Sequence, residues 1–268
     1  MKKELNGSEL AGFIKERQAK AVRGLRQEHG IAPKLAIVRT NPEKVVDSYM
    51  RIKQSYGDDI NVDVEVHTIE QSEALQLVHE LNKDDGVHGV IVQIPLPDRS
   101  QTDEVLNAVD REKDVDGLAQ GSMYDAPTAE AIYWLLSGYG IELKGKNILI
   151  VGQGRLVGLP LTKLLRSTGL EVNTADRDTE DLGNMTIEAD ILITAAGSPG
   201  VITPDMVRPD VVIVDAGVST DSNGLVGDVS AEVRDMPGVT MTPIKGGVGP
   251  LTVAALFENV ITAARKQT

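Results

Sequence analysis

The sequence predicts an α/β fold with mostly parallel sheets, because apolar segments typical of strands alternate with amphipathic helical patterns along the whole chain. The alternation falls into two series. A chain of 268 residues, 41% hydrophobic and 25% charged, is long and apolar enough to form the core of one large domain or the cores of two domains. In the second series a glycine-rich turn follows the first strand, and this predicts a Rossmann-type doubly wound parallel sheet.

The first series lies in the N-terminal part of the chain. Its apolar segments predict strands at 34–39, 62–67 and 87–94. Amphipathic stretches predict helices at about 43–56 and 72–83. We expect Asn41-Pro42 to begin the first of these helices and Gly57 to end it, since proline favours the first helical turn and glycine the position after the last.

The second series begins after a helix predicted at about 128–138, which is followed by Gly138 and Gly140. Its predicted strands lie at 147–151, 170–175, 190–195 and 211–215. A final helix at about 250–265 is expected to begin at Pro250, after the glycine-rich turn at 246–249.

The composition excludes several classes of function. A formal net charge of −13 argues against binding to nucleic acid or to an anionic membrane surface. The N-terminus lacks the apolar core of a signal peptide and no stretch reaches the ~20 apolar residues of a membrane span, so we predict a cytoplasmic protein. The absence of cysteine excludes disulfides and a catalytic thiol, and the four scattered histidines predict no metal site.

A candidate dinucleotide site follows the strand at 147–151, where the turn reads Gly152-Gln153-Gly154-Arg155-Leu156-Val157-Gly158 and opens a helix. The first glycine permits a tight turn, the second lets the backbone approach a pyrophosphate, and helix N-terminal amides bind the phosphates. A purely structural glycine-rich turn is the alternative.

The choice of cofactor depends on the end of the next strand. Asp176, 24 residues after Gly152, can bind both ribose hydroxyls of NAD and would repel the 2′-phosphate of NADP. The neighbouring Arg177 could instead pair with that phosphate. The sequence leaves the choice open, with a preference for NAD on charge alone.

Candidate catalytic side chains occur in three places. Gln93 interrupts an apolar run that ends in Pro95 and Pro97, and a buried amide there needs a hydrogen-bond partner. Tyr49 and Lys53 have helical i, i+4 spacing and can reach one ligand together. Two carboxylates, Asp114 and Asp116, lie in a predicted turn, where ordinary turn chemistry is the alternative explanation.

These motifs together resemble the bifunctional methylenetetrahydrofolate dehydrogenase/methenyltetrahydrofolate cyclohydrolase family. The resemblance rests on their order and spacing over nearly the whole chain: Tyr49-x-x-x-Lys53, Val92-Gln93-Ile94-Pro95-Leu96-Pro97, Lys113-Asp114-Val115-Asp116-Gly117, Gly152-x-Gly154-x-x-Val157-Gly158-x-Pro160, Ala196-Gly197-x-Pro199, Val214-Asp215-Ala216-Gly217-Val218 and Gly246-Gly247-Val248-Gly249-Pro250-Leu251-Thr252.

The resemblance implies two α/β domains around a cleft that binds folate. It implies a catalytic domain at 1–120 plus 248–268, a Rossmann domain at 121–247 and a homodimer joined through the Rossmann domains. Tyr49 would stack on the aminobenzoyl ring, Asp116 would bind the pterin, and Lys53 would be the catalytic amine held by Gln93. Further implied folate contacts are Pro95, Leu96, Gly247, Val248, Gly249 and Pro250. The implied cofactor contacts are Gly152, Gln153, Gly154, Val157, Gly158, Asp176, Arg177, Gly197 and Val218.

Two reactions follow from the resemblance. Hydride passes from the methylene group of the folate to the nicotinamide, and the protein mainly aligns the two carbons. Water then attacks the methenyl cation, and Lys53 assists the proton transfers that give formyltetrahydrofolate. Partial burial would lower the pKa of Lys53, and Asp116 would oppose that shift.

The chain departs from the family pattern at several positions. Gln153-Gly154 replaces the usual Arg-Ser, and Asp176-Arg177 replaces His-Ser, which puts the family's default NADP in doubt. Lys245 also departs from the family pattern. Its side chain is either solvated or in contact with the folate tail or a cofactor phosphate. The alternatives to a bifunctional enzyme are a single-activity member, a catalytically silent binding protein and an oxidoreductase of the shikimate-dehydrogenase type.

Overall fold

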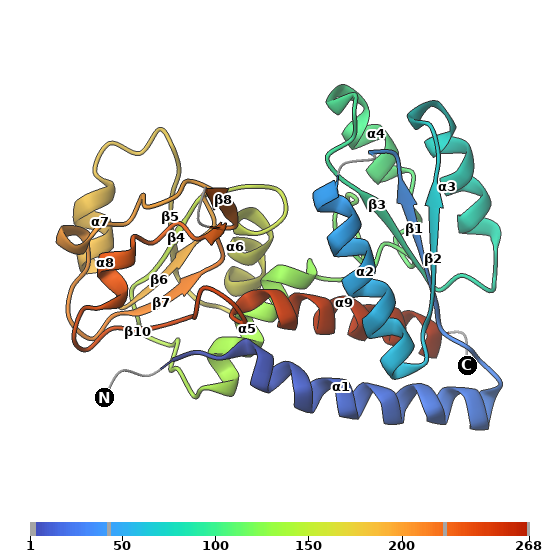
Figure 1. Cartoon of the computed structure of the whole chain (residues 1–268), viewed down its shortest axis with the longest axis horizontal. Coiled ribbons are helices and arrows are strands. Elements are labelled where there is room, and N and C mark those ends of the chain that lie inside the picture. The colour runs from blue at the N-terminus through green and yellow to red at the C-terminus, as the bar shows by residue number, and fades with distance from the viewer. Residues whose placement is uncertain (1–3, 42–43, 222–223, 267–268) are drawn as a thin grey trace. The chain divides into compact units, whose positions relative to one another are not determined.

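The structure is a computed structural model that describes residues 4–41, 44–221 and 224–266. The chain forms two compact units (Figure 1). Unit 1 comprises Met1–Ala11 and Thr128–Thr252, and unit 2 comprises Gly12–Pro127 and Val253–Thr268. Both contain a parallel sheet with helical connections, which confirms the predicted fold class. The predicted functional domains, at 1–120 plus 248–268 and at 121–247, stay predictions.

Unit 2 is built on a parallel three-stranded sheet with the order β2-β1-β3. Its strands are β1 (Lys34–Arg39), β2 (Asp63–Thr68) and β3 (Gly89–Gln93). Its helices are α2 (Lys44–Ile60), α3 (Ala74–Lys83) and α4 (Thr102–Asn107), with the parts of α1 (Gly7–Gly24) and α9 (Val248–Arg265) that fall in this unit. A π-helix at Leu25–His29 extends α1.

Both faces of β1 and β3 are buried, as the apolar runs in these strands require, whereas the residues of the edge strand β2 are half-buried or exposed. Ala36 and Val38 share one face with Val90, and α3 and α4 cover that face. Leu35 and Ile37 alternate to the other face and are fully buried. There the ring of Tyr56 on α2 stacks on that of Phe257 on α9, with centroids 5.0 Å apart.

Helix α2 does not end at Gly57 as predicted, but continues to Ile60. A Cβ on Gly57 would lie 2.5 Å from Val64 Cγ2 and 2.8 Å from Val62 O. Glycine is therefore needed at this position for close packing against Val62 and against Val64 of β2. The residue with left-handed backbone geometry after the helix is Asn61, with φ of 61°. The predicted start of α2 at Asn41-Pro42 falls partly outside the described residues.

Unit 1 contains a parallel five-stranded sheet with the order β10-β7-β6-β4-β5. Its strands are β4 (Ile148–Val151), β5 (Val172–Ala175), β6 (Ile191–Thr194), β7 (Val212–Asp215) and β10 (Thr240–Met241), and β8 (Ser219–Asp221) pairs with β9 (Gly224–Val226) in a separate antiparallel pair. Its helices are α5 (Pro127–Gly138), α6 (Gly158–Ser167), α7 (Leu182–Glu188) and α8 (Ala231–Arg234).

The strand order of unit 1 reverses at β4, because β5 lies on one side of β4 and β6 on the other. In doubly wound sheets a ligand binds at the carboxyl edge next to this reversal. The final helix begins at Val248, so Pro250 lies in its first turn rather than at its start. Within residues 4–41, 44–221 and 224–266, no helix combines the length and apolar character needed to cross a membrane.

Candidate active site

Lys53 and Gln93 meet in unit 2 at the carboxyl end of β3. Lys53 lies on α2, and Gln93 is the last residue of β3. The Lys53 ammonium donates a hydrogen bond of 3.2 Å to Gln93 Oε1, and Gln93 Nε2 donates one of 3.1 Å to the Ile94 carbonyl. The amide that needed a partner therefore has two, and it fixes the position of the lysine amine.

Asp116 reaches the same edge of the sheet from a loop that pairs with β3. Val90 N donates to Lys113 O at 2.7 Å, and Asp114 forms a parallel bridge with Val90. The chain then turns at Gly117, whose φ is +68° and where a Cβ would lie 2.7 Å from Ala126 N. Only glycine suits this turn, which directs the chain back directly after Asp116.

The charges of Lys53 and Asp116 interact, and both side chains are half-buried. Burial lowers the pKa of the Lys53 ammonium from 10.5, while the Asp116 charge opposes the change. Burial also raises the pKa of the Asp116 carboxyl, and the Lys53 charge opposes it. An amine whose pKa is lowered exchanges protons closer to neutral pH, which suits general acid-base chemistry.

Asp116 is an available acceptor. Among residues 4–41, 44–221 and 224–266, no group donates a hydrogen bond to its carboxylate. A half-buried carboxylate without donors can bind a ligand that presents N–H groups. This arrangement fits the predicted contact with the amino-bearing edge of a pterin.

The other predicted folate contacts in unit 2 differ in exposure. Tyr49 lies one helical turn before Lys53 and is 46% exposed, so its ring offers a surface for stacking. Pro95, which follows a cis peptide bond, is also exposed. Leu96 is instead part of the core beneath α3 and α4. Its contact with a ligand stays a prediction.

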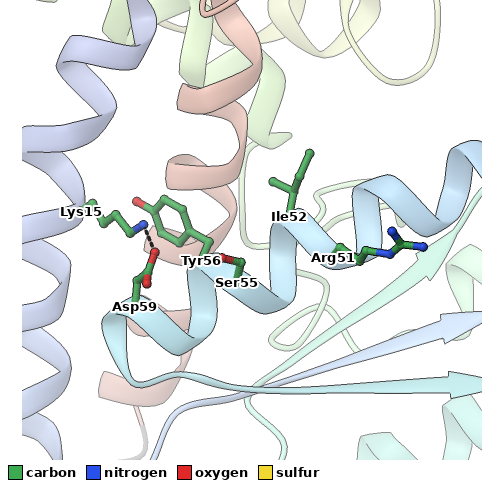
Figure 2. A pocket seen from close by; sticks show the side chains of 6 residues that line it. All are labelled: Lys15, Arg51, Ile52, Ser55, Tyr56 and Asp59. Carbon is green, nitrogen blue, oxygen red and sulfur yellow. Dashed lines mark hydrogen bonds and ion pairs between the residues drawn. The ribbon is translucent and has the colours of Figure 1, made fainter.

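A surface hollow of about 330 Å³ lies between α1 and α2 of unit 2 (Figure 2). Ile52, which lines it, directly precedes Lys53 in α2. Lys15 and Asp59 form an ion pair across the hollow, and Lys15 Nζ lies 4.8 Å from the centre of the Tyr56 ring. The remaining lining residues are Arg51 and Ser55. The Lys15–Asp59 pair is neutral overall, so the lining carries one net positive charge, from Arg51.

The glycine-rich turn of unit 1 has the geometry of a phosphate-binding loop. Gly152 follows β4 with φ of +93°, and a Cβ there would lie 2.5 Å from Ala195 O. A Cβ on Gly158, the first residue of α6, would lie 1.8 Å from Gly152 O. Gly154 is exposed, and a Cβ there would meet no atom within 4 Å. The turn is thus tightly packed at Gly152 and Gly158 and open to solvent at Gly154, where a pyrophosphate would approach. These residues fit a nicotinamide dinucleotide.

Gln153 is bound within this turn. Its Nε2 donates to Gly152 O at 3.2 Å, and its Oε1 accepts from Thr162 Oγ1 at 3.2 Å. Val157 is half-buried at the end of the same turn. The amide of Gln153 therefore braces the turn, and unlike the arginine usual in the family it brings no charge to a phosphate.

Asp176 follows β5 directly and lies beside the turn, since Gly152 N donates to Ala175 O at 2.8 Å. Its Oδ1 accepts from Asp178 N at 3.0 Å and from Thr179 Oγ1 at 3.2 Å, which holds the exposed carboxylate in place. The second oxygen, Oδ2, takes part in neither bond. Arg177 is also exposed.

The remaining predicted residues lie on three loops of unit 1 and in the first turn of α9. Gly197 follows β6 and Val218 follows β7, both at the carboxyl edge, and Val218 is 56% exposed. Gly247 packs on the N-terminal segment, because a Cβ on Gly7 would lie 1.8 Å from Gly247 O. Val248 is buried, Gly249 is exposed and Pro250 is half-buried in the first turn of α9, and Lys245 is exposed. Their roles stay predictions.

Comparison with known proteins identifies the family. A family model described as "Tetrahydrofolate dehydrogenase/cyclohydrolase, catalytic domain" matches residues 5–116, and one described as "Tetrahydrofolate dehydrogenase/cyclohydrolase, NAD(P)-binding domain" matches residues 126–268. The chain belongs to the tetrahydrofolate dehydrogenase/cyclohydrolase family. The resemblance drawn from the sequence motifs is confirmed.

Relatives in this family match the chain over its whole length. The bifunctional protein FolD of Lactobacillus acidophilus is 35% identical over 100% of this chain and 99% of its own. The crystal structure of the bifunctional enzyme FolD from Campylobacter jejuni has a TM-score of 0.95 at 32% identity and covers 100% of both chains. The structure of the Trypanosoma brucei enzyme, complexed with NADP cofactor and inhibitor, has a TM-score of 0.92 at 26% identity. The match covers 99% of this chain and 98% of that chain.

Two further side chains of this family member support the loop that carries Asp116, and one of them, Asn259, was missed in the sequence. Asn259 on α9 donates to Val115 O at 2.9 Å and to Asp125 O at 3.1 Å, and so ties both ends of the Asp116 loop to the helix. The Asp114 carboxylate accepts from Ala119 N at 2.8 Å inside the same loop. Asp114 was considered in the sequence as a candidate site carboxylate, with turn chemistry as the alternative, and this hydrogen bond fits the alternative. No sequence signal links Asn259 to residues more than 130 positions away.

Proposed function

We propose that this protein catalyses both the NAD(P)-dependent oxidation of methylenetetrahydrofolate to methenyltetrahydrofolate and the hydrolysis of that product to formyltetrahydrofolate. The observation that carries the proposal is the Lys53 amine, bound at 3.2 Å by Gln93 and coupled to Asp116 at the end of the unit 2 sheet. The two family models and the bifunctional relatives support the same pair of reactions. The alternatives of a single-activity member and of a shikimate-dehydrogenase-like enzyme are not favoured.

In this proposal each side chain has one role. Asp116 accepts hydrogen bonds from the pterin, and the exposed Tyr49 ring stacks on the aminobenzoyl group. Gln93 holds Lys53 through its carboxamide oxygen, so the neutral amine can turn its lone pair and its second N–H toward the folate. When water adds to the methenyl carbon, the Lys53 amine takes a proton from it. Lys53 then gives this proton to the ring nitrogen as the C–N bond breaks, and the remaining hydroxyl proton is released to solvent.

The nicotinamide cofactor, when bound, accepts the hydride. Gly152, Gly154 and Gly158 would hold its pyrophosphate against the turn before α6. We further propose that NAD is favoured over NADP, because Asp176 presents a fixed carboxylate where the ribose would lie and Gln153 carries no charge. The Trypanosoma brucei relative was crystallised with NADP, the cofactor that the sequence resemblance implies as the family's default.

The proposed assembly and location come from the family resemblance. We expect a homodimer joined through the nucleotide-binding domains and a cytoplasmic enzyme of one-carbon metabolism. Size-exclusion chromatography with light scattering tests the first expectation.

The direct test of the function is an initial-rate assay with methylenetetrahydrofolate and each cofactor in turn. Reduced nicotinamide and methenyl product are followed at their separate wavelengths, and hydrolysis of added methenyltetrahydrofolate is measured without cofactor. A bifunctional enzyme shows cofactor-dependent oxidation and cofactor-independent hydrolysis. Oxidation without hydrolysis, or hydrolysis without oxidation, would identify a single-activity member instead.

A further inference from the structure

Two buried aspartates, Asp215 and Asp228, are joined by a hydrogen bond at the carboxyl edge of the unit 1 sheet. Asp215, the last residue of β7, accepts from Thr194 Oγ1 and from Arg234 Nη2, both at 3.1 Å. Its side chain is only 3% exposed. It also accepts from the backbone amide of Asp228 at 3.0 Å, so the first carboxylate holds the residue that carries the second.

Asp228 is fully buried, and a short loop wraps around its carboxylate. Its Oδ2 accepts from Ala196 N at 2.7 Å, and its Oδ1 accepts from Ser198 N at 2.8 Å. Between these amides, Gly197 has φ of +64°, which lets both N–H groups point inward. Charge-assisted hydrogen bonds of this length are stronger than neutral ones, so the loop after β6 is bound at both ends.

The loop after β7 packs on the same carboxylate. A Cβ on Gly217 would lie 2.2 Å from Asp228 Cγ, so that position has no room for a side chain. A Cβ on Gly227 would likewise lie 2.0 Å from Asp215 Oδ2. Two glycines thus let two carboxylates approach neighbouring backbone directly. Asp228 N and Gly217 N both donate to Asp215 Oδ1, which ties this loop into the same cluster.

We propose that Asp228 is a positioning residue for the dinucleotide: its carboxylate sets the geometry of loop 196–198 and loop 216–218 together. The proposal rests on the proposed function, since these loops carry the predicted cofactor contacts Gly197 and Val218. Both loops leave the sheet at its carboxyl edge, where doubly wound sheets bind their ligands. Asp228 itself acts on the cofactor only through the loop backbone.

Replacement of Asp228 with asparagine tests the role of the second acceptor oxygen. Asparagine has nearly the same shape but only one acceptor, and its NH₂ group would face a backbone N–H. We expect the Kd for NAD⁺ and NADP⁺, measured by titration calorimetry, to rise at least about tenfold in D228N. Hydrogen exchange at the amides of 196–198 should accelerate, while β4 and β6 stay protected.

Two controls separate this role from general damage. D205N makes the same chemical change at an exposed carboxylate of unit 1, which accepts from Thr203 Oγ1, and it should leave the Kd unchanged. Hydrolysis of methenyltetrahydrofolate needs no cofactor and uses Lys53 of unit 2, so its rate in D228N should stay within about twofold.

The outcomes are distinct. A D228N Kd within twofold of the wild type would overturn the proposal. Loss of protection in β4 and β6 as well as in the loop would also overturn it, because Asp228 would then support the whole unit and not these loops in particular. If the wild type bound neither NAD⁺ nor NADP⁺, the proposed function itself would fail, and this is seen before any variant is compared.

Discussion

Replacement of Asn259 with alanine should loosen the loop that presents Asp116. Asn259 Nδ2 donates to Val115 O at 2.9 Å and to Asp125 O at 3.1 Å, and the side chain is buried. Without the amide, the Val115 carbonyl loses its donor in a buried position and the Asp125 carbonyl loses one in a partly buried position. At roughly 1–2 kcal/mol for each unsatisfied group, we expect the free energy of unfolding to fall by about 2–4 kcal/mol.

The assay is urea unfolding combined with the kinetics of methenyltetrahydrofolate hydrolysis. With an m-value of about 3 kcal/mol/M for a chain of this size, the midpoint should fall by about 1 M. A displaced Asp116 should also raise the KM for the folate about tenfold, since small misplacements of binding groups are costly. Asn184→Ala, which removes an exposed amide bonded only locally to Asp181 at 2.9 Å, is the control. A midpoint shift below about 0.3 M with an unchanged KM would refute the reasoning.

Two further predictions concern the cofactor and the titration of Lys53. Asp176→Ser should raise kcat/KM for NADP relative to NAD, because it removes a carboxylate that would repel the 2′-phosphate; an unchanged ratio would show that Asp176 does not touch the ribose. Since burial lowers the pKa of Lys53 from 10.5, the folded protein holds fewer protons than the unfolded chain between the lowered value and 10.5. In that window the free energy of unfolding of the wild type, minus that of Lys53→Met, should rise with pH in urea titrations. A flat difference would show that Lys53 has an ordinary pKa.

The fold was predictable where the sequence pattern is local. Most strands of the two parallel sheets are short apolar runs, and β1 lies at the predicted 34–39. β10 was missed because two residues carry no periodic signal. Gly57 was wrongly predicted to end α2, since a glycine needed for close packing and a glycine needed for a left-handed turn look the same in the sequence.

The candidate site was predictable only in part. The resemblance brought Lys53 and Gln93 together as a pair, and the 3.2 Å hydrogen bond confirms that contact. The supporting residues could not be predicted in the same way. Asn259 and Asp228 act on backbone atoms, and a backbone carbonyl or amide leaves no mark in the sequence that would identify its partner.

The central claim is that the Lys53 amine, held by Gln93, moves the protons in the hydrolysis of a one-carbon folate. The most direct test is Lys53→Met, with the exposed Lys163→Met as control. Methenyltetrahydrofolate hydrolysis is followed by the loss of its absorbance, and folate binding is followed by calorimetry. The account predicts a rate at least about 100-fold lower with a Kd within about threefold of the wild type. Hydrolysis by Lys53→Met at the rate of the wild type would contradict it.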